Sequence, residues 1–415
     1  MIDKTRQVLA CRICNEQKLE SIIDFGDLAL TGVFLEVGRE VKKEPLVLCR
    51  CKKCGLVQLG HNYSEKDLYG KSYGYESHLN SVMVKHLQQT ARMLEMKYLV
   101  DTRHLIVVDI ASNDGTLLSG YTNTSMLKIG IDPLLDVVSD FYPSGAVKIN
   151  SFFSSEEYWR SQSSPSNLVT SLSVLYDLDN PIAFAQSINE ILVDEGIWYF
   201  EQSYLPLMIK STSYDTICHE HLLYLSLHDV RRILDQSGFS ILEGSVNPTN
   251  GGSIAITAIK TNKNLPLPQF VIDLLNSEVE SGIVSGAAVQ TFAQNYLQHM
   301  AELSMLLAKF KLQGADVIGF GASTKGNVLL QINGLDSRDI RAIGDVNPRK
   351  FGKQTPGSGI PIVSEKELID AAGEKTVALV LPWHFREGLV TSLEVYLSKG
   401  GKLIFPLPNI EVVSS

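Results

Sequence analysis

Short apolar runs alternate with amphipathic stretches of helical length over the middle of the chain. Each run suits a strand that is buried on both faces, and the runs are 105–110, 127–132, 167–174 and 196–201. Helical periodicity over 181–193 and 227–237 separates later strands of this series. Strands that alternate with helices predict an α/β fold with a doubly wound parallel sheet, whose ligands bind at the carboxyl ends of the strands.

A second set of elements of the same kind lies near the C-terminus. A strand at 315–320 leads into a glycine-rich turn and a helix, and further strands are predicted at 342–345 and 377–384. Two Rossmann-like halves in one chain suggest an ancient duplication. Between them, residues 266–312 start with two prolines and continue as an amphipathic stretch, which predicts a loop and one or two helices packed between the domains.

Five of the six cysteines lie within the first 54 residues. Cys11 and Cys14 form one C-x-x-C pair, and Cys51 and Cys54 form another. Two such pairs can supply the four sulfur ligands of a structural zinc site, which stabilises the fold and does no chemistry. Cys49 could compete as a ligand, and buried free cysteines are the plainer alternative.

Composition and charge narrow the class of protein. The chain has 415 residues, of which 44% are hydrophobic and 20% are charged, as in a globular protein of two or three domains. Its net charge of −9, from 37 basic and 46 acidic residues, disfavours nucleic acid as a partner. No run approaches the roughly 18–20 consecutive apolar residues of a membrane span. No apolar signal core follows the first residues, so a cytoplasmic protein is predicted.

The turn after the first predicted strand carries the first candidate chemistry. Asp109 lies near the end of that strand, and the turn 111–118 has a single glycine, unlike a G-x-G-x-x-G pyrophosphate cradle, and leads into a predicted helix. Asp132 ends the second strand, where a carboxylate can accept both ribose hydroxyls of an adenosine ligand. The combination favours S-adenosylmethionine, which has no phosphate, although a nucleotide-binding Rossmann domain fits the same pattern.

The densest polar segment of the chain, residues 214–224, follows the predicted strand that ends at Glu201. Its motif His219-Glu220-His221 offers a base that titrates near working pH, a carboxylate to orient it and a second imidazole. The spacing of the two histidines also suits metal ligands, and a structural role is the plainer alternative for any single histidine.

Several motifs together resemble the bacterial S-adenosylmethionine-dependent sugar C-3′-methyltransferases, a family that includes the enzyme of tetronitrose biosynthesis. The matching stretches span nearly the whole chain and are the two C-x-x-C pairs, 112–118, 132–133, 219–221, 250–253 and 319–327. The resemblance implies a zinc-binding module, a central class I methyltransferase domain and a C-terminal Rossmann-like domain. It also implies methylation at C-3′ of a TDP- or GDP-linked 4-keto-6-deoxy sugar, through an enolate that needs a base and a donor near the keto oxygen.

The resemblance also implies roles for individual residues. His221 would be the general base, with Glu220 and His219 beside it. Tyr75, or alternatively Tyr73, would reach the sugar, unless this pair packs between domains.

The chain departs from the family's pattern at two positions. Cys218 stands where the tetronitrose-type enzymes have a tyrosine, and Asp177 stands where they carry a histidine. A shift of the short match by one residue would make Tyr176 the active-site group instead. Asp177 could act as the base or orient His221, and the thiol of Cys218 is assigned no role in methyl transfer.

The predicted site residues fall into four groups. The catalytic candidates are His221, Glu220, His219, Asp177, Tyr75 and Tyr176. The candidates for binding S-adenosylmethionine are Asp109, Ser112, Asn113, Asp114, Gly115, Leu117, Asp132, Pro133, Asn150, Phe152, Ser171 and Ser173. The candidates for binding the nucleotide sugar are Tyr73, Tyr75, Tyr204, Tyr224, Asn250, Gly251, Gly252, Ser323, Lys325, Asn327, Asn347 and Lys350. The zinc ligands are Cys11, Cys14, Cys51 and Cys54.

Two of these assignments have simpler alternatives. The stretch 250–253 before a strand is typical of a hairpin turn as well as of a close approach to a ligand. In the C-terminal half, Lys325, Asn327, Asn347, Lys350 and Lys353 would meet the phosphates or the base of the nucleotide. Read instead as an NAD site, that half would imply a dehydrogenase.

The predicted domains are a zinc-binding module over 1–65, a helical connector over 66–100, a methyltransferase domain over 101–265, and linker helices with the sugar-binding domain over 266–415. Other functions fit parts of the sequence: an NAD-dependent nucleotide-sugar dehydrogenase or epimerase, an O-methyltransferase, and a non-catalytic zinc module with a basic binding face between residues 37 and 54. A monomer is predicted, because both halves lie in one chain. The acidic net charge and the lack of a long apolar run predict that it binds neither nucleic acid nor membrane.

Overall fold

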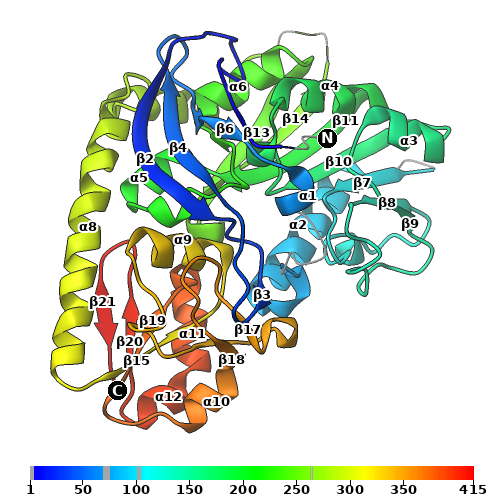
Figure 1. Ribbon diagram of the computed structural model, residues 1–415. Coiled ribbons are helices and arrows are strands. Elements are labelled where there is room, and N and C mark those ends of the chain that lie inside the picture. Colours follow the sequence, from blue (N-terminus) through cyan, green and yellow to red (C-terminus); the bar gives the residue numbers. More distant parts are fainter. Residues whose placement is uncertain (1–3, 69–74, 101–103, 262, 264) are drawn as a thin grey trace.

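Three regions, each built on a β-sheet, make up the molecule (Figure 1). The computed structural model describes residues 4–68, 75–100, 104–261, 263 and 265–415. No helix of these described residues is long and apolar enough to span a membrane.

The N-terminal region is a four-stranded antiparallel sheet in the order β12-β5-β4-β2. The strands are β2 (Leu19–Ala29), β4 (Lys43–Cys51), β5 (Val57–Leu59) and β12 (Leu223–Tyr224). Two smaller pairs flank it, β1 (Arg6–Gln7) with β6 (His61–Asn62) and β3 (Leu35–Glu36) with β17 (Lys353–Gln354). Because β12 and β17 come from later in the chain, this region is hydrogen-bonded to both Rossmann-like halves.

The central region is a seven-stranded sheet in the order β13-β14-β11-β10-β7-β8-β9. The strands are β7 (Ile106–Ile110), β8 (Leu127–Ile131), β9 (Val147–Ile149), β10 (Ser166–Leu172), β11 (Leu192–Ser203), β13 (Phe239–Asn247) and β14 (Ser253–Lys260). All five residues of β7 are buried, as expected for a parallel strand that helices cover on both faces. The predicted doubly wound parallel sheet is therefore confirmed, with β14 as its antiparallel strand.

Helices cover this sheet and are fixed by local caps. They are α2 (Ser81–Tyr98), α3 (Ser155–Ser161), α4 (Pro181–Ile191), α5 (Leu205–Lys210) and α6 (Leu227–Asp235), and the short α1 (Glu65–Leu68) precedes them. The side chain of Asn180 caps α4, and the side chains of Ser226 and Asp229 form a capping box that starts α6.

The helix predicted after the first turn of this sheet is wrong. The chain makes only a short 3₁₀ helix, Leu118–Gly120, before β8 begins. At Gly120 a Cβ atom would lie 2.8 Å from the Cβ of Ala91 and from the Cα of Gln88, so the backbone there packs directly against α2. Helix α2, which comes earlier in the chain, thus covers the place where the expected helix would lie.

The C-terminal region repeats the order of the first five strands of the central one, 3-2-1-4-5. Its sheet runs β18-β16-β15-β19-β20-β21, parallel except for β21. The strands are β15 (Asp316–Phe320), β16 (Ile343–Asp345), β18 (Ile362–Ser364), β19 (Thr376–Val380), β20 (Lys402–Phe405) and β21 (Glu411–Val413). Its helices are α9 (Thr324–Ile332), α10 (Glu365–Asp370), α11 (Arg386–Ser392) and α12 (Glu394–Ser398). This confirms the prediction of two Rossmann-like halves.

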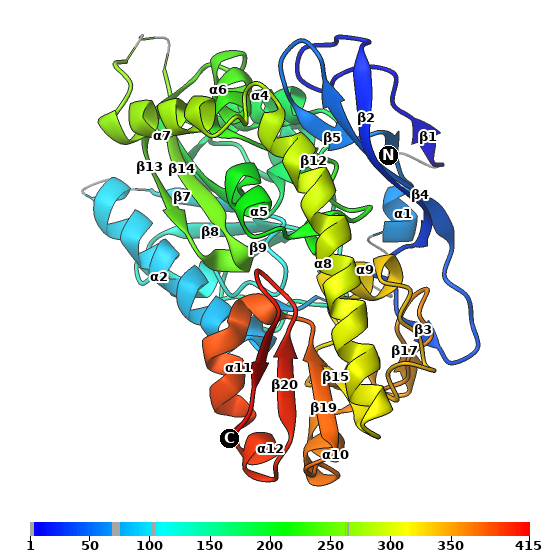
Figure 2. The same ribbon diagram turned by 90° about the vertical axis from the view of Figure 1, so that its left-hand side faces the viewer.

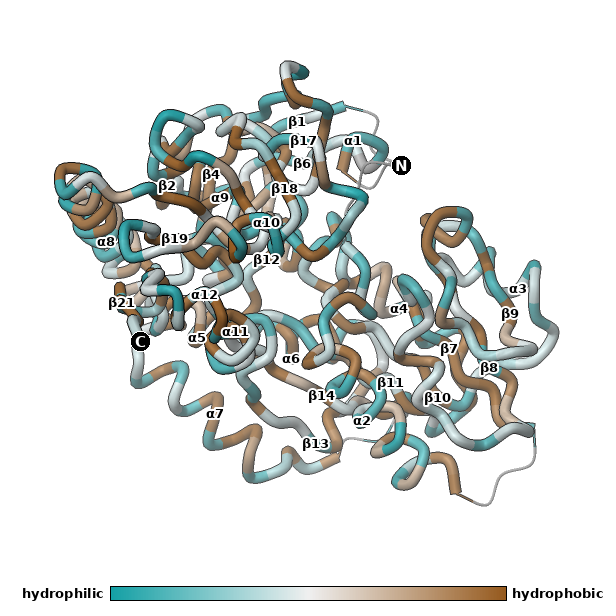
Figure 3. The backbone as a smooth tube through the Cα atoms, turned by 90° about the horizontal axis from the view of Figure 1, so that it is seen from below, coloured by the Kyte–Doolittle hydropathy of each residue, from teal (hydrophilic) through white to brown (hydrophobic). Residues whose placement is uncertain are grey.

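Two helices connect the halves, as the amphipathic stretch predicts. Helix α7 (Gln269–Glu280) alternates between apolar and polar positions in the hydropathy view (Figure 3). Helix α8 (Ala287–Leu312) runs along the molecule beside the N-terminal sheet and the C-terminal half (Figure 2) and contacts β2, α5 and β15. It therefore braces all three regions against one another.

Candidate active site

The four cysteines of the two C-x-x-C pairs form one cluster. Their sulfur atoms all lie within 4.8 Å of one another, and the Cys11–Cys54 and Cys14–Cys51 sulfur pairs are each 3.5 Å apart. A tetrahedral zinc ion with bonds of about 2.3 Å needs sulfur atoms roughly 3.8 Å apart. Cys49 lies outside this cluster of described residues. The donor set therefore fits a closed, structural zinc site.

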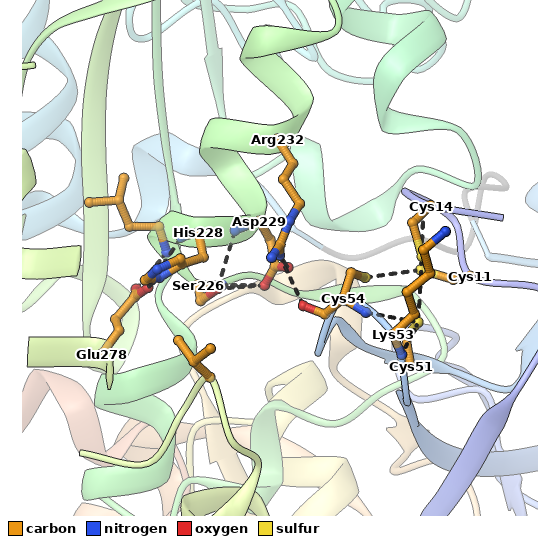
Figure 4. A network of polar contacts seen from close by, with 12 residues as sticks. Cys11, Cys14, Cys51, Lys53, Cys54, Ser226, His228, Asp229, Arg232 and Glu278 are labelled. Atoms are coloured by element: carbon orange, nitrogen blue, oxygen red, sulfur yellow. Dashed lines mark hydrogen bonds and ion pairs between the residues drawn. The ribbon is translucent and has the colours of Figure 1, made fainter. Parts of the chain in front are cut away.

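The zinc cluster is linked to helix α6 of the central region (Figure 4). Arg232 donates from Nη1 to the carbonyl oxygen of Cys54 at 2.9 Å and to Oδ1 of Asp229 at 3.3 Å. The other carboxylate oxygen of Asp229 accepts a hydrogen bond from the hydroxyl of Ser226 at 2.6 Å. Strand β12, just before this helix, pairs with β5 of the zinc-bearing sheet. The cluster thus fixes the chain directly after the His219-Glu220-His221 motif.

His221 is placed as a neutral imidazole with one defined tautomer. Its Nδ1 lies 2.8 Å from the carbonyl oxygen of Thr216, which can only accept, so Nδ1 carries the proton and Nε2 keeps its lone pair. Burial, and then the charge of Lys325, lower the pKa of His221 to about 3. The ring packs edge-on against Tyr176, with the centroids 4.4 Å apart.

A small cavity lies beside His221 at the carboxyl end of the central sheet. It has a volume of about 10 Å³, enough for about one water molecule, and Tyr176 and Tyr224 line it together with His221. The hydroxyl of Tyr224 is buried and has no hydrogen-bond partner among the described residues. The cavity therefore brings together a basic nitrogen and an unsatisfied hydroxyl.

The other two residues of the motif face the N-terminal region. Nε2 of His219 donates to the carbonyl oxygen of Glu44 at 3.1 Å, and its ring contacts Tyr63. Glu220 accepts a hydrogen bond from the hydroxyl of Thr31 at 3.2 Å, and burial raises the pKa of its carboxyl. Both side chains thus anchor the loop to the zinc-bearing sheet, and neither lines the cavity.

Of the two candidates after β10, Tyr176 is the residue that reaches the cavity. It lies in the short 3₁₀ helix Leu175–Asp177. Asp177 is close enough that its charge, acting in addition to burial, raises the pKa of Tyr176 and of Cys218. Cys218 is fully buried.

The predicted cofactor turn is held by the acid at the end of β8. Asp132 accepts hydrogen bonds from the backbone N–H of Asn113 at 3.0 Å and of Leu134 at 2.7 Å. Asp109 lies deeper, where its carboxylate accepts a bond from the hydroxyl of Thr170 at 2.6 Å and burial raises its pKa to about 7. Asp132 is thus the acid nearer the turn, and Asp109 braces the strands.

Two glycines form a flat cradle beside Asp132. A Cβ atom on Gly115 would lie 2.4 Å from the ring of Tyr142, and one on Gly130 would lie 2.2 Å from its hydroxyl oxygen. The ring of Tyr142 therefore lies directly on this bare backbone, and its hydroxyl is bonded to Ser112. A surface that accommodates a planar ring next to a carboxylate fits the adenosine of S-adenosylmethionine.

The remaining predicted cofactor residues lie in different surroundings. Asn113 and Asp114 hold the segment 75–78, Leu117 is buried, Pro133 is partly buried, and Asn150 and Phe152 are exposed. Ser171 accepts a bond from the indole N–H of Trp198 in the core, at 3.0 Å. Ser173 lies within 3.4 Å of the side-chain amide of Asn250.

The segment that resembles the family's tyrosine motif bridges the two halves. The backbone N–H of Ser77 donates to Asn113 at 3.0 Å, and His78 is bonded to Asp114 at 2.9 Å. On the other side, Arg349 lies 3.2 Å from the carboxylate of Glu76. Tyr75 is 47% exposed, and Tyr73 lies outside the described residues. The segment therefore links the cofactor turn to the C-terminal half.

Most predicted sugar-binding residues of the C-terminal half have partners within the protein. Ser323 caps α9, and Asn327 donates to the carbonyl oxygen of Thr31 at 2.7 Å. Lys350 donates to the carbonyl oxygen of Ala322 at 2.7 Å and lies 3.3 Å from Asp345. Asn347 caps a 3₁₀ turn, and Lys353 lies in β17. In the central half, the hydroxyl of Tyr204 donates to Glu278 at 2.6 Å.

Lys325 differs from these residues because it reaches across to the central half. Its ammonium donates to the carbonyl oxygen of Asn250 at 2.6 Å, in the turn between β13 and β14. That turn is a hairpin, with Asn250, Gly251 and Gly252 at positive φ.

Sequence reasoning missed a group around this hairpin. Trp383 packs on Gly251, where a Cβ atom would lie 3.2 Å away, and its indole N–H donates to the buried Asp215 at 2.7 Å. His384 follows, and burial lowers its pKa well below the usual value. The strand predicted over 377–384 ends at Val380, and Trp383 and His384 lie in the 3₁₀ helix that follows it. The carboxyl end of a parallel strand is where functional side chains gather, so the signal was present.

Comparisons with known proteins agree with this arrangement. Three family models match the chain: a zinc binding domain over residues 11–69, a methyltransferase domain over 79–243 and a C-methyltransferase C-terminal domain over 248–408. The C-methyltransferase NovU of Streptomyces niveus is 26% identical over 422 residues, which cover 100% of this chain and 99% of that protein.

Solved structures match the chain over less than half of its length. Magnesium protoporphyrin IX methyltransferase (ChlM) from Synechocystis PCC 6803 is 16% identical, with a TM-score of 0.31, over 47% of this chain and 89% of that one. The CurJ carbon methyltransferase is 12% identical, with a TM-score of 0.34, over 45% of this chain and 57% of that one.

The sheet order, the cysteine cluster and the three successive family matches define a methyltransferase with a zinc-binding module. The chain is a C-methyltransferase: it carries a C-methyltransferase C-terminal domain after the other two domains and is similar over its full length to the C-methyltransferase NovU. Its methyl donor is S-adenosylmethionine, and its cysteine cluster is a zinc site.

Proposed function

We propose that this enzyme methylates C-3′ of a TDP- or GDP-linked 4-keto-6-deoxy sugar. The observation that carries the proposal is the neutral His221, whose Nε2 lone pair lies beside a cavity shared with Tyr176 and Tyr224. The resemblance of the motifs to sugar C-3′-methyltransferases supports a sugar as the acceptor.

The chemistry follows from the acidity of a carbon next to a ketone. Removal of the C-3′ proton leaves a charge that delocalises onto the 4-keto oxygen, so the site needs a base and a donor. Nε2 of His221 is the base, because Nδ1 is held in its protonated form by Thr216. The unsatisfied hydroxyl of Tyr224 is available to hold an oxygen of the sugar.

The cofactor would lie on the cradle of Gly115 and Gly130, with Asp132 at the ribose hydroxyls. When bound, S-adenosylmethionine supplies an electrophilic methyl group. The ring of Tyr142 must leave the cradle to admit it. The segment 75–78 closes one side of this turn through Asn113 and Asp114.

The dehydrogenase alternative has less support in the C-terminal half. Asp345, the acid that would accept the ribose of NAD, is paired with Lys350 and with the backbone N–H of Ala322. The O-methyltransferase alternative needs only a base for a hydroxyl, and His221 would serve either reaction.

The direct test is incubation of the purified enzyme with S-adenosylmethionine and the TDP- and GDP-linked 4-keto-6-deoxy sugars. We expect a product heavier by one methylene with one of them, and loss of the C-3′ proton signal in its NMR spectrum. A methylated product that keeps this proton would replace carbon methylation with O-methylation. The cytoplasmic monomer stays a prediction, to be checked by cell fractionation and sedimentation.

A further inference from the structure

The position of Lys325 is energetically unfavourable for a positively charged side chain. The residue is in the first turn of α9, two residues after the Ser323 cap, and the dipole of a helix disfavours a positive charge at this end. Burial lowers the pKa of its ammonium, and the charge of the buried Asp215 acts against this shift. A cation held against two unfavourable effects points to a function rather than to helix stability.

The ammonium of Lys325 also has hydrogen-bonding capacity left over. An ammonium carries three N–H donors. Among the described residues, the carbonyl oxygen of Asn250 is its one acceptor, at 2.6 Å. Two donors are therefore available to an oxygen of a bound molecule.

A short chain of contacts leads from Lys325 to the base. The side-chain amide of Asn250 lies 3.4 Å from the hydroxyl of Ser173, which precedes Tyr176 by three residues. The ring of Tyr176 lies 4.4 Å from the ring of His221. The hairpin that carries Asn250 is fixed by Trp383, which packs on Gly251 and is itself held by Asp215. The C-terminal half thus presents Lys325 to the reacting end of the central half.

We propose that Lys325 is a catalytic residue that hydrogen-bonds the 4-keto oxygen of the sugar and stabilises its enolate, an inference that rests on the proposed function. As Nε2 of His221 takes the C-3′ proton, the C–H electron pair forms the C-3′–C-4′ double bond. The carbonyl π pair moves to the oxygen, where two N–H groups of Lys325 hold it. On transfer of the methyl group, the C–C π pair forms the new bond, the sulfur keeps its electron pair, and the carbonyl is restored.

The same ammonium could instead bind the diphosphate, as the sequence pattern predicts. The two roles differ in their kinetics. A diphosphate contact is made equally in the ground and transition states and appears in KM, whereas a contact to the enolate oxygen appears in kcat.

The test compares Lys325→Met and Lys325→Arg with the control Lys366→Met, a surface lysine of α10 paired with Asp370. The readouts are kcat and KM for methylation, and exchange of the C-3′ proton with D₂O at saturating sugar with S-adenosylhomocysteine present. We expect Lys325→Met to lose roughly 10²–10³-fold in kcat and in exchange, with KM changed less than about three-fold. Lys325→Arg should retain more activity, and the control should match the wild type.

Two results would overturn this role. A raised KM with kcat and exchange intact would assign Lys325 to the diphosphate, and unchanged kinetics would leave it without a function in the reaction. If Lys325→Met unfolds early in a thermal scan, Lys325→Gln, which can keep the bond to Asn250, must show the same loss. Absence of both methylation and exchange in the wild type is a separate result, which would overturn the proposed function and this inference with it.

Discussion

The two Rossmann-like halves use the same device at the same place and then diverge. In the central half, Asp132 after β8 accepts a bond from the backbone N–H of Asn113; in the C-terminal half, Asp345 at the end of β16 accepts one from Ala322 at 2.8 Å. An acid at the end of the second strand thus holds the turn after the first strand in both. In the C-terminal half, however, Lys350 lies 3.3 Å from this acid and donates to the same turn.

The halves also match at the ends of β10 and β19, each of which is the fourth strand of its sheet in chain order. A 3₁₀ helix follows β10 at Leu175–Asp177, and another follows β19 at Trp383–Phe385. The first 3₁₀ helix brings Tyr176 to His221. The second brings Trp383 to Gly251 in the hairpin between β13 and β14. The same topology therefore has two different surroundings: one half carries the turn that we propose for the cofactor, and the other directs its turn and helix α9 toward the partner half.

Zinc removal should have the largest effect, because the zinc-bearing sheet pairs with the central half through β12, and β3 of the same N-terminal region pairs with β17 of the C-terminal half. We expect about one zinc per chain, and loss of activity and of cooperative unfolding after chelation, since structural zinc contributes about 10–16 kcal/mol in small modules. Zinc content and thermal unfolding measure this. Cys51→Ser should lose the ion, and the matched control Cys49→Ser should keep it. Equal zinc content in both variants would contradict the four-cysteine site.

Replacing the histidine of each half should affect methylation unequally. His221→Ala should lower kcat by roughly 10²–10⁴-fold, the usual contribution of a general base. His384→Ala, which lies beyond Trp383 in the other half, should lose less than about ten-fold. Steady-state kinetics measure kcat for both variants. Binding of S-adenosylmethionine by each variant shows that it is folded. A larger loss in His384→Ala would move the base to the C-terminal half.

Replacement of Asp132 and of Asp345, the equivalent acids of the two halves, should affect different properties: cofactor affinity in the first case and stability in the second. Asp132→Ala should weaken S-adenosylmethionine binding by roughly 10- to 100-fold, because hydrogen bonds to a charged group contribute about 1.5–3 kcal/mol. Asp345→Ala should leave that affinity within about two-fold but lower Tm, because Lys350 and the N–H of Ala322 lose their partner. Calorimetric titration and thermal scans give both numbers. Similar affinity losses in the two variants would mean that the halves do not differ in this way.

Acid should destabilise the contact between the central half and the zinc-bearing sheet through His219. Burial lowers the pKa of His219 to about 4, so between pH 6.5 and 4 the unfolded state binds a proton that the folded state does not. Stability therefore falls with falling pH in this window, by about 1.4 kcal/mol per unit and per histidine. Asp109, with its raised pKa, acts in the opposite direction.

The comparison of wild type with His219→Gln isolates this effect, because other groups cancel in the difference. Urea unfolding at pH 7.5 and 5.5 should show the stability of the variant falling less on acidification than that of the wild type. An identical pH dependence would mean that His219 is protonated in the folded protein.

The smallest expected effect concerns the ring that covers the cofactor cradle. Tyr142→Ala removes the ring from Gly115 and Gly130, so S-adenosylmethionine should bind a few-fold more tightly, with kcat little changed. Weaker binding in the variant would show that Tyr142 holds the cofactor once it is bound.

The sequence was sufficient for the features that depend on local pattern. Buried strands, the paired cysteines and the acid at the end of each second strand follow from periodicity and spacing, and the strand order and the cysteine cluster confirm them. The helix expected after the first turn was wrong because α2, from earlier in the chain, occupies that position.

Contacts between distant segments could not be read from the sequence. His219 and Glu220 look equivalent to His221 in the motif, yet they bind Glu44 in β4 and Thr31 just after β2. Lys325 looks like a phosphate ligand, yet it reaches Asn250 of the other half. Such pairings depend on how the three regions pack, which no local pattern specifies.

Methylation at carbon is tested by the NMR spectrum of the product formed from S-adenosylmethionine with a ¹³C-labelled methyl group and unlabelled TDP- or GDP-linked 4-keto-6-deoxy sugar. We expect a labelled methyl group attached to a sugar carbon that has lost its proton. We also expect that His221→Ala forms almost none of this product. A labelled methyl group attached to oxygen would contradict carbon methylation and the enolate on which the roles of His221 and Lys325 depend.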